Sequence, residues 1–353
     1  MTEGYVITEK PDSAERQQIR KIYDGAGITL LMFLVIFYFL AGRISIIVLN
    51  LIFTPGTESY VNAAQIINLV VVVLLELGTV FLGSRLTGIK IRSLFKTEGF
   101  TGKTLVKTYF TAQGLGFAGS YAGGIIIAIV TVIFGQNMST FTSGLEQSMA
   151  QSDFVMGIIL IQGVITAPIL EELIFRGIIL GALSRYDRTF AIIVSAVMFG
   201  ATHGNFQQAV YATVMGIVFG AIALRYNSII PSVIAHTFVN AFAAVSAIIM
   251  SSSGYLDVVA RALNTNNPLE ILQYITPQMI MTVMLVALLN IGIVITAVVI
   301  VITNRKRFRE FFNKATAAGK ARSLPILITS IPWDINFAVA IFMIFVNPFV
   351  GLI

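Results

Sequence analysis

Residues 154–183 read FVMGIILIQGVITAPILEELIFRGIILGAL, an apolar run of thirty residues that contains three charged side chains. A helix crosses the hydrocarbon core of a bilayer in about twenty residues, so this run is long enough to span a membrane. A barrel strand would alternate in polarity, and an open sheet edge cannot face lipid. The run therefore predicts a transmembrane helix that carries Glu171, Glu172 and Arg176 in its interior.

The rest of the chain repeats this pattern of long apolar runs separated by short polar loops. Further runs lie near 27–53, 62–83, 109–135, 189–203, 207–225, 228–250, 278–303 and 335–353. Of the 353 residues, 56% are hydrophobic and 11% are charged, whereas soluble domains carry about 25% charged residues. The sequence predicts an all-α, polytopic membrane helix bundle of eight or nine transmembrane helices, and the last run is the one least certain to span fully.

The basic residues are concentrated in alternate loops. If the N-terminus is placed in the cytoplasm, the cytoplasmic segments hold 20 of the 23 lysines and arginines. Cytoplasmic loops of membrane proteins carry such an excess, so the pattern predicts a multi-pass cell-membrane protein with a cytoplasmic N-terminus. The same placement explains the net charge of +6 without nucleic-acid binding. The chain has no cysteine, which excludes disulfides, thiolate metal sites and a cysteine nucleophile.

We expect four parts in the chain. These are a cytoplasmic segment over 1–26, N-terminal transmembrane helices over 27–150, a catalytic helix core over 151–250, and C-terminal transmembrane helices with a basic cytoplasmic loop over 251–353. The basic loop either contacts anionic lipid headgroups or flanks a stop-transfer segment, and the second interpretation is favoured.

Charged groups inside a bilayer are costly and mark functional sites by default. Glu172 and Arg176 are four residues apart and can pair on one helix face. Glu171 is rotated by about 100° from Glu172 and is free to point at another group. A buried ion pair that only orients the bundle would explain Glu172 and Arg176, but it would leave Glu171 unexplained. For Glu76, in the run 62–83, we favour a structural or interfacial role.

Both histidines of the chain also fall in apolar runs. Phe199 precedes His203 by one helical turn, and Asn240 follows His236 by one turn. Counted from the predicted cytoplasmic ends of their helices, Glu171, His203, His236 and Asn240 lie roughly 12–21 Å deep at about 1.5 Å per residue. The run that ends at His203 is too short to cross, so we expect a cavity beside it. Pro168 is expected to kink the helix that carries the two glutamates.

Three motifs resemble those of the CAAX protease and bacteriocin-processing family, also called the CPBP or Abi family. They are Glu171-Glu172-x-x-x-Arg176, Phe199-x-x-x-His203 and His236-x-x-x-Asn240, in that order and on separate apolar runs. The resemblance covers about residues 150–250 and implies an all-helical endopeptidase with its site inside the membrane. Family members trim prenylated CAAX proteins or are linked to bacteriocin maturation, self-immunity or peptide signalling, and the motifs do not choose among these roles.

Peptide hydrolysis needs a base for water, groups that hold the oxyanion, and an acid for the leaving amine. We assign Glu171 as the base, with His203 positioning the water. His236 and Asn240 would hold the oxyanion, while Arg176 would keep Glu172 ionised and its helix face fixed. The alternative is one divalent metal such as zinc, with His203, His236 and Glu171 as candidate ligands. The His-Glu-x-x-His helix of zincins is absent, and we favour the metal-free mechanism.

Two functions from other classes compete with the protease hypothesis. A proton-coupled transporter would use the buried acids and histidines as a relay, but it is expected to show inverted repeats and broken helices in pairs, which the sequence lacks. A non-catalytic membrane scaffold or sensor would tolerate decayed motifs, whereas these are intact. The expected partners are membrane lipids and a membrane-associated peptide or protein substrate, without nucleic acid. The sequence assigns neither the oligomeric state nor a need for a prenyl anchor.

Overall fold

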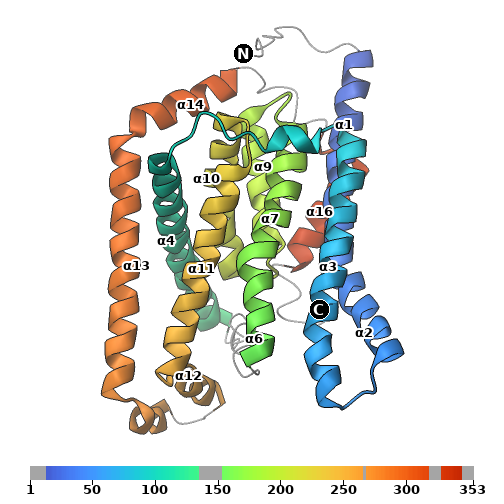
Figure 1. Ribbon diagram of the computed structural model, residues 1–353. Helices are drawn as coiled ribbons and strands as arrows, with labels where there is room; N and C mark the ends of the chain where they lie inside the picture. Colours follow the sequence, from blue (N-terminus) through green and yellow to red (C-terminus); the bar gives the residue numbers. More distant parts are fainter. Residues whose placement is uncertain (1–12, 135–152, 265–267, 318–326, 344–353) are drawn as a thin grey trace.

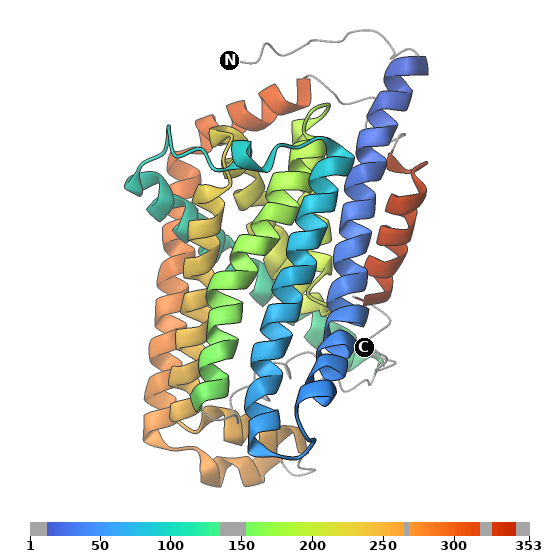
Figure 2. The same cartoon turned by 45° about the vertical axis from the view of Figure 1, so that its right-hand side comes forward.

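The computed structural model describes residues 13–134, 153–264, 268–317 and 327–343 (Figure 1). These residues form helices and connecting turns, and no strand occurs among them. The long helices run side by side along one direction and form a bundle, and short helices lie across its ends (Figure 2). The predicted all-helical membrane bundle is therefore confirmed.

The N-terminal part is a helical hairpin. Its elements are α1 (Ser13–Val35), the π-helix η1 (Ile36–Leu40), α2 (Ala41–Ile52) and α3 (Glu58–Thr87). Helices α1 and α3 approach closely because small residues lie at their crossing. A methyl group on Gly25 would lie 2.9 Å from the carbonyl oxygen of Leu86, and one on Gly83 would lie 2.6 Å from the side chain of Thr29. After α3, the chain turns at Gly88 and continues through η2 (Ile91–Leu94) into α4 (Gly102–Phe134).

The run that carries both glutamates is one continuous helix with two π-helical stretches. It consists of α6 (Asp153–Leu160), η4 (Ile161–Thr166), α7 (Ala167–Glu172), η5 (Leu173–Ile179) and α8 (Leu180–Leu183). Pro168 lies in the first turn of α7, where its missing N–H leaves the carbonyl one turn earlier without its usual partner. The predicted irregularity at Pro168 is thus present as wide π turns, which are frequent at functional sites. Glu172 is the last residue before the second of them.

The short run that ends near His203 folds as a half-length helix. Helix α9 (Arg188–Ala201) stops before His203, and α10 (Phe206–Tyr226) begins after a turn in which Gly204 has a φ of +69°. Asn205 accepts a hydrogen bond from the backbone N–H of Gln208 and so caps α10. At about 1.5 Å per residue, α9 is roughly 20 Å long, which is too short to cross a bilayer.

The remaining helices complete the bundle around this centre. They are α11 (Ile230–Ser252), α12 (Tyr255–Asn264), η6 (Pro268–Tyr274), α13 (Pro277–Thr303), α14 (Arg305–Ala317) and α16 (Ile331–Ile341). Helix α16 packs on α1, where Trp333 donates to the carbonyl oxygen of Tyr23 and Asn336 donates to that of Gly27, each at 2.8 Å. The predicted last run thus begins earlier than expected, and its part beyond residue 343 lies outside the described residues.

The described residues contain six helices that are long and apolar enough to cross a membrane. The predicted count of eight or nine stays unconfirmed, because α9 and α16 are shorter apolar helices and the first run is divided by η1. The basic loops lie at one end of the bundle, where Ile229 donates to the carbonyl oxygen of Leu94 and Arg188 to that of Leu224. This clustering supports the predicted topology, while the cytoplasmic orientation of that end remains a prediction.

Candidate active site

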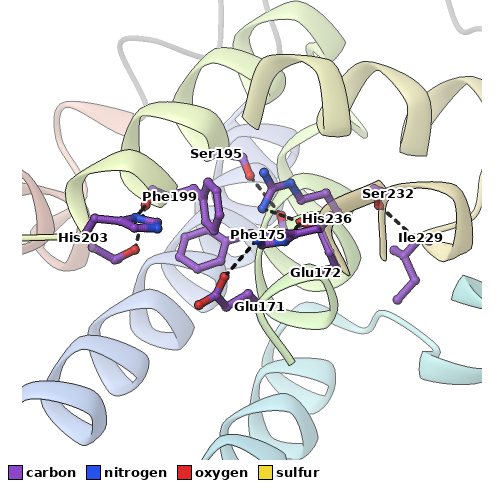
Figure 3. Close-up of polar contacts among 11 residues, drawn as sticks. Glu171, Glu172, Phe175, Ser195, Phe199, His203, Ile229, Ser232 and His236 are labelled. Carbon is purple, nitrogen blue, oxygen red and sulfur yellow. Dashed lines mark hydrogen bonds and ion pairs between the residues drawn. The ribbon is translucent and has the colours of Figure 1, made fainter. Parts of the chain in front are cut away.

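Four of the six predicted site residues meet between two neighbouring helices in the interior of the bundle, and Figure 3 labels three of them, Glu171, Glu172 and His236. Glu171, Glu172 and Arg176 come from the α7–η5 helix, and His236 comes from α11. The chain therefore brings together, from positions 64 residues apart, the acids and one of the two histidines that sequence reasoning singled out.

Glu172 is enclosed by ionic partners. Its Oε1 atom lies 3.0 Å from Nη1 of Arg176 and 3.1 Å from Nδ1 of His236, and the Glu172 and Arg176 side chains are fully buried. The predicted pairing of Glu172 with Arg176 is thus present. Because a carboxylate only accepts hydrogen bonds, the contact assigns a proton to Nδ1 of His236 when Glu172 is ionised.

Three aromatic rings surround the Arg176 guanidinium. Its central carbon lies 4.1 Å from the ring centre of Phe199, 5.4 Å from that of Phe219 and 6.0 Å from that of Phe175. The nitrogen atoms of Arg176 make no hydrogen bonds with correct geometry to the described residues, so Glu172 and the ring faces supply its compensation. The motif residue Phe199 therefore has a defined physical role, because it covers a buried cation.

Glu171 has a more open position than its neighbour. Its side chain retains 20% of its exposure, and its Oε2 atom lies 3.8 Å from Nε2 of His236. The His236 ring thus lies between two carboxylates, with Nδ1 toward Glu172 and Nε2 toward Glu171 (Figure 3). Glu171 thus faces a different group from the Arg176 partner of Glu172, in keeping with its predicted rotation from Glu172.

His203 lies beside this network and does not bond to it directly. Its Nδ1 atom pairs with the carbonyl oxygen of Phe199 at 3.0 Å, so Nδ1 is the donor and Nε2 is left for other partners. The Phe199 ring stands edge-on to both imidazoles, with ring centres 5.1 Å from His203 and 5.6 Å from His236. Phe199 therefore separates the two histidines, and His203 makes no hydrogen bond or ion pair with either glutamate.

Asn240 follows His236 by one turn on α11, as the spacing predicted. Its side-chain amide donates to the carbonyl oxygen of Gly163 at 2.8 Å. Gly163 belongs to η4, where the π-helical turn frees carbonyl groups from the regular pattern. In this structure Asn240 joins α11 to η4, on the part of the helix that precedes the glutamates.

One acidic residue near the site comes from outside the motifs. Glu76 on α3 is 4% exposed, and its charge interacts unfavourably with that of Glu171. Helix α3 packs along the α6–η5 run, which brings Glu76 close enough to Glu171 for the two charges to interact. No hydrogen bond or ion pair joins Glu76 to another described side chain. The sequence signal was an isolated acid in an apolar run, but nothing in the sequence showed which helices would be neighbours.

The three candidate metal ligands do not converge in this structure. Among the described residues, no group of three histidine, aspartate or glutamate side chains is arranged to hold a metal ion. Nδ1 of His203 is bonded to a backbone carbonyl and Nδ1 of His236 to Glu172, which leaves Nε2 of each ring as its metal-binding atom. The donor set as arranged does not fit a catalytic zinc site, which needs three protein ligands around one point.

Residues 153–242 match the family described as Type II CAAX prenyl endopeptidase Rce1-like. Over 131 residues, the chain is 33% identical to the "Putative membrane peptidase YdiL" of Bacillus subtilis (strain 168). This alignment covers 36% of the chain and 51% of that protein, so the chain spans about half the length of its curated relative. No solved structure shows a significant match. The matched segment 153–242 holds all six motif residues, so the similarity to the prenyl endopeptidase family is confined to this part of the chain.

Proposed function

We propose that the protein is an intramembrane endopeptidase that hydrolyses a peptide bond in a membrane-associated protein or peptide. The observation that carries the proposal is the partly exposed carboxylate of Glu171, which lies beside His236 in the interior of the bundle. A carboxylate at that depth is costly, and Arg176 is occupied by the other glutamate. The likeness to a family of prenyl endopeptidases supports the same reaction class.

Glu171 acts as the general base in this proposal. It takes a proton from water as the water oxygen attacks the carbonyl carbon of the substrate, and the tetrahedral intermediate forms. His203 positions the water through Nε2, since its Nδ1 is engaged by Phe199. When the carbon–nitrogen bond breaks, the same proton passes from Glu171 to the leaving amine. Proton transfers of this kind contribute about 10²–10⁴-fold to a rate.

The oxyanion needs donors that are in place before the charge develops. His236 can supply one through Nε2, which requires that this nitrogen is protonated while Nδ1 donates to Glu172. Asn240 supplies the second donor after its amide leaves the carbonyl oxygen of Gly163. Glu172 and Arg176 hold the His236 ring and the helix face in position and do not touch the substrate.

The test uses the purified full chain in proteoliposomes with three kinds of probe. These are prenylated CAAX-type peptides, the same peptides without the prenyl group, and single-span membrane peptides. New N-termini are identified by mass spectrometry, with Glu171→Gln as the matched inactive control. We expect at least one probe class to be cut by the wild type and left intact by Glu171→Gln. Identical fragments from both proteins, or no cleavage of any class, would contradict the proposed function.

A further inference from the structure

A cavity of about 360 Å³ lies at the end of the bundle that carries the basic loops, away from the glutamates. It is lined by residues of α4, α10, α13 and α14, which are neighbours at that end in Figure 1, and it is partly open. Helix α10 lines it with a stripe that includes Val218, Ile222 and Arg225. A different stripe of α10 faces the candidate active site, because Phe219 contacts His236 and Arg176. The cavity is therefore a separate site.

The mouth of the cavity is strongly basic. Lys103, Lys107, Arg225 and Arg307 line it, and none of its lining residues is acidic. No ion pair joins these four side chains to a described acidic residue, since the salt bridges of the described residues lie elsewhere. Lys103, Arg225 and Arg307 are exposed and Lys107 is partly buried, so these cations remain hydrated. Together, without an acidic neighbour, they give this end of the cavity a positive potential that attracts an anionic ligand.

The deeper part of the cavity is apolar. Val218, Ile222 and Ile300 form this part, and the aromatic side chains of Phe308 and Phe311 on α14 cover one side. The remaining depth is lined by the buried side chains of Thr108 and Thr111, and the Thr108 hydroxyl donates to the carbonyl oxygen of Thr104. The ligand must therefore combine a negative head with an apolar tail.

We propose that this cavity binds the phosphate headgroup of an anionic phospholipid, with an acyl chain running down between α4, α10 and α13. Three features choose a lipid over a soluble anion. The cavity lies at one end of the helices Gly102–Ile129 and Pro277–Thr303, which are long and apolar enough to cross a membrane, and headgroups occur at such ends. Its floor is apolar, and α14 lies across this end with basic residues beside its aromatic face. Basic pockets between transmembrane helices are known sites for acidic headgroups.

Binding to dioleoyl phosphatidylglycerol and dioleoyl phosphatidylcholine is compared by native mass spectrometry of the purified full chain. The cavity variant is Lys107→Gln/Arg307→Gln. The matched control is Lys306→Gln/Arg309→Gln, which removes two charges from exposed positions of α14 that do not line the cavity. Each basic side chain near an anionic surface contributes about five-fold in affinity, so the cavity variant should bind phosphatidylglycerol roughly thirty-fold more weakly. The control should stay within about two-fold of the wild type, because Lys306 and Arg309 do not line the cavity and are not expected to contact a headgroup bound in it.

Two further arms test the tail and the source of the phosphate. Ala221→Phe fills the apolar part without changing the charge and should also weaken phosphatidylglycerol binding. Excess inorganic phosphate should not displace the lipid. Equal loss in the cavity and control variants, equal binding of phosphatidylcholine, full binding by Ala221→Phe, or displacement by inorganic phosphate would each overturn the proposal. The readout is binding alone, so it is independent of whether the chain is a protease.

Discussion

Two glutamates that are adjacent in the sequence have opposite surroundings. The side chain of Glu172 is completely buried and lies 3.0 Å from Arg176 and 3.1 Å from His236. That of Glu171 retains 20% of its exposure and meets Nε2 of His236 at 3.8 Å. One helical step of about 100° produces this difference. Two adjacent acids of one motif thus form two different parts of the site. Glu172, Arg176 and His236 make a closed ionic centre, and Glu171 makes an open reactive side.

The closed centre should matter most for stability. We expect Glu172→Gln to leave Arg176 buried without its counter-charge, a defect that costs on the order of 3–5 kcal/mol. Chemical unfolding in one detergent measures the loss, and the melting temperature should fall with it. The double variant Glu172→Gln/Arg176→Met removes both charges and should regain much of the stability. A Glu172→Gln protein that unfolds like the wild type would show that the ion pair contributes little, and the comparison would then fail.

The next largest effect is expected when a proposed oxyanion donor on α11 is removed. Asn240→Ala should lower kcat by about 10²–10³-fold, as for the loss of one oxyanion donor. Its lost hydrogen bond to Gly163 should cost only about 1 kcal/mol of stability. Steady-state kinetics are therefore read beside unfolding for the same preparation. If Asn240→Ala keeps full turnover and only loses stability, Asn240 is not an oxyanion donor, and its role is to join α11 to η4.

Glu76 on α3 provides a test of the surroundings of Glu171, because the charges of the two side chains interact. Glu76→Gln keeps the shape of the side chain and removes one charge that does not contact the proposed reacting atoms. We expect turnover to change by less than about ten-fold, which corresponds to about 1.4 kcal/mol. Cleavage rates of Glu76→Gln and Glu171→Gln are measured side by side. Complete loss of activity in the stable Glu76→Gln variant would transfer the role of base from Glu171 to Glu76.

The smallest expected effect is that of metal removal. His203 and His236 are separated by the Phe199 ring, and among the described residues no three histidine or acidic side chains are arranged to hold a metal ion. We therefore expect dialysis against a strong chelator to leave the cleavage rate within about two-fold, a change of about 0.4 kcal/mol. Metal content is measured in the same samples by elemental analysis. Loss of activity that zinc restores at one metal per chain would show that these ligands converge in the working enzyme.

Much of the candidate site could be predicted from the sequence, because it depends on the spacing of residues within single helices. The spacing of Glu172 and Arg176 fixes a pair on one helix face, and the next residue back must then face elsewhere. The length of the run before His203 predicted that its helix would stop early, and Gly204 with its positive φ provides the turn. Pro168 predicted an irregular helix because it has no N–H to donate. Each of these inferences needs information from only one helix and its ends.

The rest depends on which helices become neighbours. Glu76 reaches the site because α3 packs along the α6–η5 run, and a contact between helices about 90 residues apart leaves no periodic signal. Likewise, His203 could be placed in depth but not in orientation, and its bond to the Phe199 carbonyl depends on where α9 ends. The basic cavity needs four separate helices to meet. Such contacts are set by shape at helix crossings, as Gly216 shows by lying against Ala196 and Arg176.

The most direct test compares Glu171→Gln with Glu172→Gln in one detergent, with cleavage rate and melting temperature read from the same samples. The two substitutions are chemically identical and occupy adjacent positions, so each is the control for the other. We predict that Glu171→Gln melts like the wild type and has lost nearly all turnover, about 10²–10⁴-fold for a general base. Glu172→Gln should melt lower and lose activity together with its stability. A stable, inactive Glu172→Gln beside an active Glu171→Gln would reverse the two roles, and two stable, active variants would contradict the protease proposal.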